Sequence, residues 1–171
     1  HTWLPDAHTD ASTPTSMLLA GILLKMGGYG LIRMNLQLLP DFMQYFAAMF
    51  VLLGVINLLY GAFVALAQTD LKKLVAYSSI SHMGIVLIGI GALNLAGLSG
   101  AVFQMFAHGV ISAGLFMVAG IVYLRTHTRD MNHFGGLAKV MPRLSYFAMI
   151  IALASLGLPL LIGFPAETLA F

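Results

Sequence analysis

Five stretches of this sequence, each 17 to 26 residues long, are almost free of charged side chains. A helix needs about 20 apolar residues to cross the roughly 30 Å hydrocarbon core of a bilayer, and there it satisfies all its own backbone polar groups. The sequence therefore predicts an all-α, polytopic integral membrane protein with about five transmembrane helices. We expect these helices at residues 16–32, 46–69, 74–99, 100–124 and 144–166, the last of them broken.

The scarcity of charge also excludes a water-soluble fold. Lys, Arg, Asp and Glu make up 8% of the 171 residues, against about 25% in an ordinary soluble domain. Such a chain lacks the polar side chains that would cover a solvent-exposed surface. The net charge of +2 is too small and too scattered for a nucleic-acid-binding surface, so we expect lipid and no nucleic acid around the protein.

Residue counts exclude several kinds of site. The chain has no cysteine, so it cannot carry a disulfide, a thiolate zinc site or a cysteine-ligated iron–sulfur cluster. The histidine pairs His1/His8 and His127/His133 lack further ligands at metal-binding spacing, and we expect no metal site. Any redox chemistry must then take place in other chains.

We expect residues 1–171 to be a single fragment of a longer transmembrane domain. The chain begins at His1 without an initiator methionine and ends inside an apolar run at residues 168–171. Residues 1–15 are expected to form a loop ahead of the first helix. The short connection at residues 70–73 predicts that the second and third helices form a tight antiparallel pair.

The basic residues of the connections predict the orientation in the membrane. If the five helices alternate, six basic residues lie on one side and only Arg33 lies on the other. Lys and Arg concentrate on the cytoplasmic side or its equivalent, so the larger group should face the negative, proton-poor side. That group consists of Lys72, Lys73, Arg125, Arg129, Lys139 and Arg143.

One lysine stands in the middle of an apolar stretch. Lys25 is the tenth residue of the first expected helix, on the order of 10 Å from either end at 1.5 Å per residue. A charged lysine at the centre of a membrane helix costs about 2.5–3.5 kcal/mol, so it normally faces a partner or water. Lys25 is therefore a candidate for accepting and releasing protons, with a structural ion pair as the alternative.

Two histidines, His82 and His108, lie about nine residues into the third and fourth expected helices. Histidine titrates near pH 6.5 and passes protons between neighbours at little cost. Either histidine alone could simply join two helices by a hydrogen bond. Together with Lys25 at comparable depth they predict a shared proton path. Gln104, on the same helix as His108, could order water there or only hold helices together.

A carboxylate follows the expected break in the last helix. Pro159, Gly163 and Pro165 precede Glu167, and prolines and glycine in this number interrupt a helix and free backbone groups. A carboxylate beside a broken membrane helix can form an ion site at depth. The alternative is that Glu167 is an interfacial residue at a helix end.

A weaker pattern is Gly97-Leu98-Ser99-Gly100, which matches the G-x-S-G of intramembrane serine proteases. His108 would then be the base that activates Ser99. A turn between two helices explains the same residues, and we expect no catalytic residue of this kind.

Two longer motifs carry a resemblance to a known family. The first is His1-Thr2-Trp3-Leu4-Pro5-Asp6-Ala7-His8, and the second is AQTDLKKLVAYSSISHMG at residues 67–84. The chain resembles, over essentially its whole length, the antiporter-like membrane subunits of respiratory complex I. It is most similar to subunit 4 of NADH:quinone oxidoreductases, the M or D chain, because of Lys25 within Leu-Leu-Lys and of Thr126-His127-Thr128.

The resemblance implies a proton-translocating subunit of an NAD(P)H or ferredoxin:quinone oxidoreductase, in which Lys25, His82, His108 and Glu167 form the polar axis. It implies other membrane subunits of the complex as partners and no cofactor in this chain, and it places NAD(P)H or ferredoxin, iron–sulfur clusters and quinone in partner subunits. The membrane would be a bacterial plasma membrane, a thylakoid or an organelle inner membrane. The family usually has glycine where Leu160 stands, and Pro165 is unusual, so the geometry at Glu167 stays open.

Three other functions remain open from the residues alone. A multisubunit cation/proton antiporter shares these helices but uses no electron donor. The chain could also be a passive scaffold, or the intramembrane serine protease described above. The sequence does not decide between H⁺ and Na⁺, or which donor feeds the complex.

Overall fold

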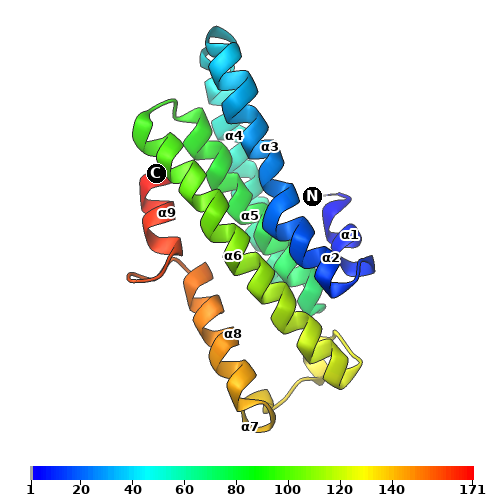
Figure 1. The fold of residues 1–171 in the computed structure, drawn as a ribbon. Helices are drawn as coiled ribbons and strands as arrows, with labels where there is room; N and C mark the ends of the chain where they lie inside the picture. The colour runs from blue at the N-terminus through cyan, green and yellow to red at the C-terminus, as the bar shows by residue number, and fades with distance from the viewer. Residues whose placement is uncertain (1) are drawn as a thin grey trace.

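The computed structural model describes residues 2–171, so His1 lies outside the described residues. In these residues the chain is helical and forms no β-sheet, which confirms the all-α class (Figure 1). The α-helices are α1 (Leu4–Asp10), α2 (Thr13–Leu18), α3 (Leu24–Gly30), α4 (Pro40–Leu66), α5 (Leu71–Gly91), α6 (Leu95–Thr126), α7 (Leu137–Val140), α8 (Pro142–Ser155) and α9 (Gly163–Ala170). Two π-helical segments, η1 (Leu19–Leu23) and η2 (Leu31–Leu36), and a 3₁₀ turn, η3 (Met131–His133), complete the list.

Within residues 2–171, four helices are long and apolar enough to cross a membrane. The first is continuous from Thr13 to Leu36 through α2, η1, α3 and η2, and the others are α4, α5 and α6. The fifth expected helix, 144–166, is divided into α8 with 14 residues and α9 with 8. Neither half alone spans about 30 Å of hydrocarbon at 1.5 Å per residue. The predicted polytopic architecture with a broken last helix is therefore confirmed.

Small residues let α4 and α5 pack closely as the predicted antiparallel pair. A Cβ atom on Gly84 would lie 2.6 Å from the carbonyl oxygen of Gly54, and one on Gly61 would lie 2.8 Å from the backbone nitrogen of Ser81. Close backbone approach at small residues is how membrane helices associate without a hydrophobic driving force. Figure 1 shows α6 crossing the length of the molecule, with α3, α4 and α5 on one side and α8 and α9 on the other.

The expected boundary between the third and fourth helices, at residues 99/100, is wrong. The turn lies at residues 92–94, where Leu93 has a φ of 52° and the Asn94 side chain accepts a hydrogen bond from Gly97 N at 2.6 Å. Asn94 therefore caps α6 at its N-terminus. Gly97 and Gly100 lie inside α6 and do not form a turn. Glycine is needed at both positions because a side chain would collide with Gly89 and with the backbone of α9, respectively.

The expected N-terminal loop, 1–15, is also only partly correct. Residues Leu4–Asp10 form α1, and the first membrane helix already begins at Thr13. Pro5 and Pro14 each lie in the first turn of a helix, where the missing N–H group has no helical partner to lose. The second membrane helix likewise starts at Pro40 instead of residue 46.

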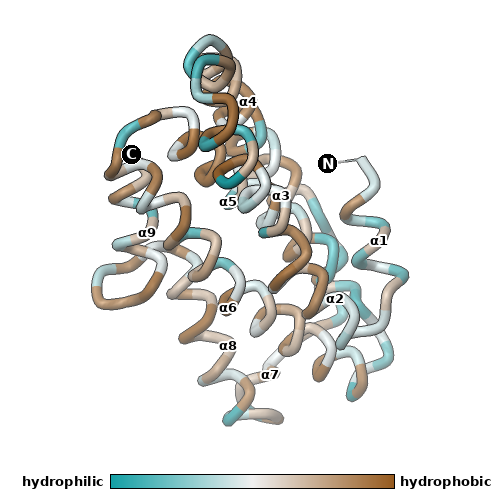
Figure 2. Tube along the Cα trace, turned by 45° about the horizontal axis from the view of Figure 1, so that its top comes forward, coloured by the Kyte–Doolittle hydropathy of each residue, from teal (hydrophilic) through white to brown (hydrophobic). Residues whose placement is uncertain are grey.

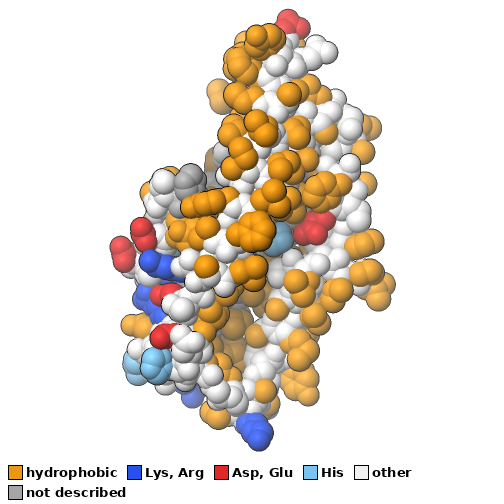
Figure 3. Space-filling model, turned by 180° about the vertical axis from the view of Figure 1, so that it is seen from behind, with side chains coloured by type: hydrophobic (Ala, Val, Ile, Leu, Met, Phe, Trp, Pro, Cys, Tyr) orange, Lys and Arg blue, Asp and Glu red, His pale blue; other side chains and the backbone are white. Residues whose placement is uncertain are grey.

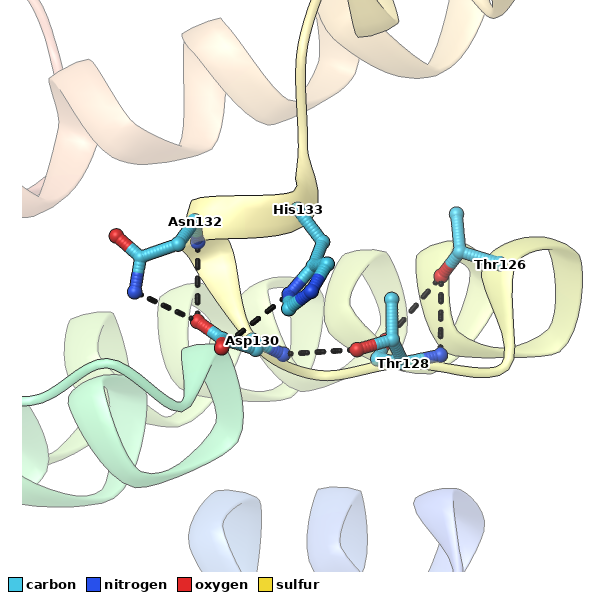
Figure 4. A network of polar contacts seen from close by, with 5 residues as sticks. All are labelled: Thr126, Thr128, Asp130, Asn132 and His133. Atoms are coloured by element: carbon cyan, nitrogen blue, oxygen red, sulfur yellow. Dashed lines mark hydrogen bonds and ion pairs between the residues drawn. The ribbon is translucent and has the colours of Figure 1, made fainter.

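The connection after α6 is bound to the turn between α4 and α5. Leu71 N donates to Arg129 O at 3.0 Å, and Met131 N donates to Thr69 O at 2.9 Å. Figure 4 shows how the loop holds its shape through Thr126, Thr128, Asp130, Asn132 and His133. The backbone N–H of Asn132 bonds Asp130 and keeps the pKa of that carboxyl below its usual range.

This contact brings the basic residues of two connections to one end of the bundle. Lys72, Lys73, Arg125 and Arg129 lie at this end, whereas Arg33 precedes α4 at the opposite end. The alternation on which the orientation rests is thus present, and the side of the membrane stays a prediction.

The surface is that of a protein surrounded by lipid. Many large apolar side chains are exposed, among them Phe63 at 70% and Leu124 at 70% of their full accessible area. Hydrophobic residues follow the long helices, while hydrophilic ones gather at α1 and the connections (Figure 2). Seen from behind, most charged groups lie towards one end and its adjacent flank (Figure 3). Apolar exposure on this scale is unusual for a soluble monomer.

Candidate proton-transfer site

The four residues singled out in the sequence come together in the structure as a series. Lys25 comes from α3, His108 from α6, His82 from α5 and Glu167 from α9. The Nζ atom of Lys25 lies 2.8 Å from Nδ1 of His108. The rings of His108 and His82 have centroids 5.6 Å apart at 41°. Nδ1 of His82 lies 3.6 Å from Oε1 of Glu167.

The backbone around Lys25 explains how a lysine is accommodated there. Lys25 Nζ also hydrogen bonds to the carbonyl oxygen of Ala20, which belongs to the π-helical segment η1. Single π-helical turns inside α-helices occur frequently at functional sites. A Cβ atom on Gly109 would lie 2.9 Å from Gly21 O and 3.7 Å from Cε of Lys25. The two glycines thus let α6 approach closely enough for Lys25 to reach His108.

Gln104 is the fifth polar group at this site. It is 2% exposed, and its Nε2 atom lies 3.5 Å from Nδ1 of His82, while its Oε1 atom is buried with no hydrogen-bond partner among the described residues. The Nδ1 atom of His82 is thus contacted by an amide donor from one side and a carboxylate acceptor from the other. The first contact suits an unprotonated Nδ1 and the second a protonated one.

A small cavity lies between the two histidines and Glu167. It has a volume of about 10 Å³ and is lined by His82, Gln104, His108 and Glu167 together with residues of α8 and α9. This is close to the lower limit of the space that one water molecule needs, and four polar groups converge on it. A single water there would be within reach of both histidines and the carboxylate.

The break between α8 and α9 directs Glu167 into the bundle. Gly157 has a φ of 64° and Leu160 a φ of 77°, in the left-handed region that favours glycine. A Cβ atom on Gly157 would lie 2.5 Å from Oε2 of Glu167, so the glycine makes room for the carboxylate. The Glu167 carboxylate points at His82, and its position relative to the membrane interface stays a prediction.

His8, which the sequence connects only with metal binding, has the lowest exposed fraction of the histidines in residues 2–171. Its exposed fraction is 0%, neither ring nitrogen has a hydrogen-bond partner in residues 2–171, and the ring stacks on Phe116 with centroids 4.5 Å apart. Burial, followed by the charges of Lys72 and Lys25, lowers the pKa of His8 to about 4. Sequence patterns give no signal for such burial, because α1 lies outside the membrane helices.

The structure separates the two residues of the serine protease alternative. Ser99 and His108 lie on the same helix, α6, nine residues apart. Nine residues correspond to two and a half helical turns, so the side chains point to opposite faces about 13.5 Å apart along the axis. Ser99 is exposed on the apolar side of the helix. His108 therefore cannot activate Ser99, and the hypothesis of an intramembrane serine protease that uses these two residues is wrong.

Comparisons with known proteins agree with this fold. The family described as NADH:quinone oxidoreductase/Mrp antiporter, transmembrane, matches residues 1–171. The chain is 57% identical over 171 residues to NAD(P)H-quinone oxidoreductase chain 4 2 of Thermosynechococcus vestitus, and 56% identical to NAD(P)H-quinone oxidoreductase chain 4 1 of Synechococcus elongatus. Both alignments cover 100% of this chain and 32% of the relative, so the chain spans about a third of their length.

Solved structures show the same fold in respiratory membrane complexes. A chain of respiratory complex I from Thermus thermophilus with bound NADH matches with a TM-score of 0.93 and 37% identity, over 99% of this chain and 36% of that one. A chain of the membrane-bound sulfane sulfur reductase, an archaeal respiratory membrane complex, matches with a TM-score of 0.87 and 27% identity, over 99% and 35%.

The family match, the cyanobacterial relatives and the apolar helices point to an integral membrane protein of a plasma or thylakoid membrane. The identity to chain 4 relatives exceeds half of the aligned residues over the whole of this chain. The chain belongs to the NADH:quinone oxidoreductase/Mrp antiporter transmembrane family, as an antiporter-like segment of the subunit 4 type.

Proposed function

We propose that the protein containing this chain translocates protons across the membrane as a subunit of an NAD(P)H or ferredoxin:quinone oxidoreductase. The observation that carries the proposal is the series Lys25, His108, His82 and Glu167, in which each group lies within a few ångströms of the next. The chain 4 relatives support the oxidoreductase assignment.

The first step of the proposed path joins Lys25 and His108. At 2.8 Å one proton lies between the two nitrogens, and Nδ1 of His108 can accept it only while that histidine is neutral. Two positive charges 4 Å apart repel by about 4 kcal/mol at an effective dielectric constant of 20. A second proton arriving at Lys25 therefore drives the first one on towards His82.

The second step joins His82 and Glu167. His82 receives the proton from His108 across the short ring-to-ring gap, directly or through one water, and then donates it from Nδ1 to the carboxylate. Glu167 releases it where the broken helix frees backbone groups for water. Electron transfer takes place in partner subunits, which carry the nicotinamide or ferredoxin site, the iron–sulfur clusters and the quinone.

The test is substitution of Lys25 in the full-length protein within its complex. In Lys25→Ala, proton pumping by proteoliposomes should fall by about tenfold or more, as expected when a relay loses its central group, while the complex still assembles. Lys139→Ala, an exposed lysine on α7, is the matched control and should pump normally. Normal pumping by Lys25→Ala would rule out the proposed path.

The rival function is that of a cation/proton antiporter without redox activity. The purified complex should oxidise NAD(P)H or ferredoxin with quinone as acceptor, which an antiporter does not do. Absence of that activity together with Na⁺-dependent proton exchange would favour the rival.

A further inference from the structure

A second cavity, distinct from the series described above, lies at the basic end of the bundle. It has a volume of about 160 Å³ and is lined by parts of the α1–α2 connection, the start of α5, the end of α6 and the loop that follows α6. Three membrane-crossing helices begin or end there, at Thr13, Leu71 and Thr126. The cavity is therefore at the level where the hydrocarbon core meets the lipid headgroups.

Lys72 and Arg129 line this cavity, and neither forms an ion pair with a carboxylate of residues 2–171. Lys72 is only 7% exposed. In residues 2–171, no carboxylate oxygen lies within 4 Å of Lys72 Nζ or of the Arg129 guanidinium nitrogens. Asp70 instead accepts hydrogen bonds from the backbone N–H groups of Lys72 and Lys73, at 2.7 and 3.2 Å. Asp70 and Asp10 are near enough to act on the charge of Lys72, but neither forms an ion pair with it, so the partly neutralised cavity still favours a further anion.

Both cations keep donors available for such an anion. Lys72 Nζ donates to Ala11 O at 2.6 Å, and Arg129 Nη1 donates to Thr9 O at 2.9 Å. An ammonium carries three N–H groups and a guanidinium five, so most of the donors are not used by the described residues. The guanidinium is held over the ring of Tyr123 at 4.7 Å, which fixes its orientation.

The remaining lining combines hydroxyl and apolar groups. Ser12, Thr13 and Thr128 bring hydroxyls to the cavity, and Leu71, Leu124 and Phe134 bring apolar side chains. Phosphate oxygens suit an arginine fork, a lysine and hydroxyl donors together. The apolar wall suits the glycerol and first methylenes of a lipid. Basic pockets between membrane helices on the cytoplasmic or matrix side bind phospholipid headgroups.

We propose that this cavity binds the phosphate group of an anionic membrane lipid and that the bound lipid supplies the counter-charge for Lys72 and Arg129. The lipid would then connect the α1–α2 segment, α5 and α6 at the headgroup level. The proposal does not depend on proton transport through Lys25.

The test uses the purified complex containing the full-length protein, in neutral detergent. Phosphatidylglycerol retained per complex is counted by native mass spectrometry, and the thermal midpoint is measured with phosphatidylglycerol, phosphatidylcholine or inorganic phosphate added. Ser12→Glu places a carboxylate at the exposed edge of the cavity without removing either cation. It should retain one phosphatidylglycerol fewer than the wild type and lose the stabilisation that this lipid provides.

Ser12→Gln, of similar size and uncharged, is the matched control and should retain the lipid. Lys72→Gln with Arg129→Gln should lose it as well, whereas Lys139→Gln with Arg143→Gln, on the same side but outside the cavity, should not. Lys72 and Arg129 also donate hydrogen bonds to backbone carbonyls, so the double variant could fail to fold. In that case the comparison of Ser12→Glu with Ser12→Gln tests the proposal.

Three results are distinguishable. Protection by phosphatidylglycerol alone, lost in Ser12→Glu, supports a lipid site. If inorganic phosphate displaces that lipid and raises the thermal midpoint equally, the cavity binds phosphate, and free phosphate is the ligand. Equal retention of phosphatidylglycerol in the wild type and Ser12→Glu, or equal protection by phosphatidylcholine, overturns the proposal.

Discussion

Lys25 and His108 are separated by 83 residues in the sequence, and their Nζ and Nδ1 atoms lie 2.8 Å apart. The contact depends on the close approach of the first membrane helix to α6 at Gly21 and Gly109. A lysine held in this way against a histidine has a defined partner for its proton. The spacing of the helices is therefore as important for the site as the titratable groups themselves.

The first prediction concerns that spacing. Gly109→Val should push α6 away from the first helix, because even a Cβ atom would lie 2.9 Å from Gly21 O. Proton pumping by the complex in proteoliposomes should fall by about tenfold or more, in line with the sensitivity of proton transfer to misplacement. Gly27→Ala is the control, since no atom lies within 4 Å of the added Cβ there. Unchanged pumping by Gly109→Val would contradict the importance of this contact.

The second prediction separates the function of Gln104 from its contribution to stability. Gln104→Leu removes the amide donor 3.5 Å from His82 Nδ1 and also the buried Oε1 atom that has no partner among the described residues. His82 Nδ1 keeps its contact with Glu167 Oε1 at 3.6 Å, and loss of a buried oxygen without a partner removes a desolvation penalty, so the substitution should cost little stability. Pumping should therefore slow while the thermal midpoint of the complex stays the same or rises. A fall in the midpoint with unchanged pumping would show a purely structural role.

The third prediction concerns the break between α8 and α9. Leu160 is fully exposed and has a φ of 77°, a conformation that costs a non-glycine residue about 1–2 kcal/mol. Leu160→Gly should relieve this strain and stabilise the complex by up to about 1 kcal/mol after the entropy cost of glycine. Leu158→Gly, in the same loop but without a positive φ, should be neutral or destabilising. Thermal unfolding of both variants checks this, and a lower midpoint for Leu160→Gly would be inconsistent with the strain.

The fourth prediction is a pH dependence that originates at His8. The pKa of His8 is lowered from 6.5 to about 4 in the folded state, so the unfolded chain binds more protons in the window between these values. Stability should therefore fall as the pH decreases from about 6.5 towards 4, by at most about 3 kcal/mol at one pKa unit per 1.36 kcal/mol. In His8→Phe, which keeps a ring against Phe116, this part of the pH dependence should disappear.

The measurement is the thermal midpoint of the complex at a series of pH values, for the wild type and His8→Phe in parallel. The control is His133→Phe, at an exposed histidine. Its thermal midpoint should still show the fall between about pH 6.5 and 4 that the wild type owes to His8. Identical profiles for the wild type and His8→Phe would assign the acid sensitivity to other groups.

The sequence by itself determined the class of the protein and singled out the four residues that the proposed proton path uses. Long uncharged stretches, the lysine and histidines within them and the prolines before Glu167 are local features, and their consequences in lipid follow from hydrophobicity and backbone hydrogen bonding. For the same reason the approximate positions of the helices and the broken last helix could be predicted. Helix ends were less accurate, because Gly97 and Gly100 look like turn residues and are contact residues instead.

Only the tertiary structure decided the order Lys25, His108, His82 and Glu167, the burial of His8 and the placement of Lys72 and Arg129 around one cavity. These relationships join residues from different helices, and no periodicity within a single helix encodes them. They depend on which small residues allow two backbones to approach and at what register the helices pack. The physical reason is that each segment forms a membrane helix because of its own length and hydrophobicity. A proton path instead needs several helices packed at fixed distances from one another.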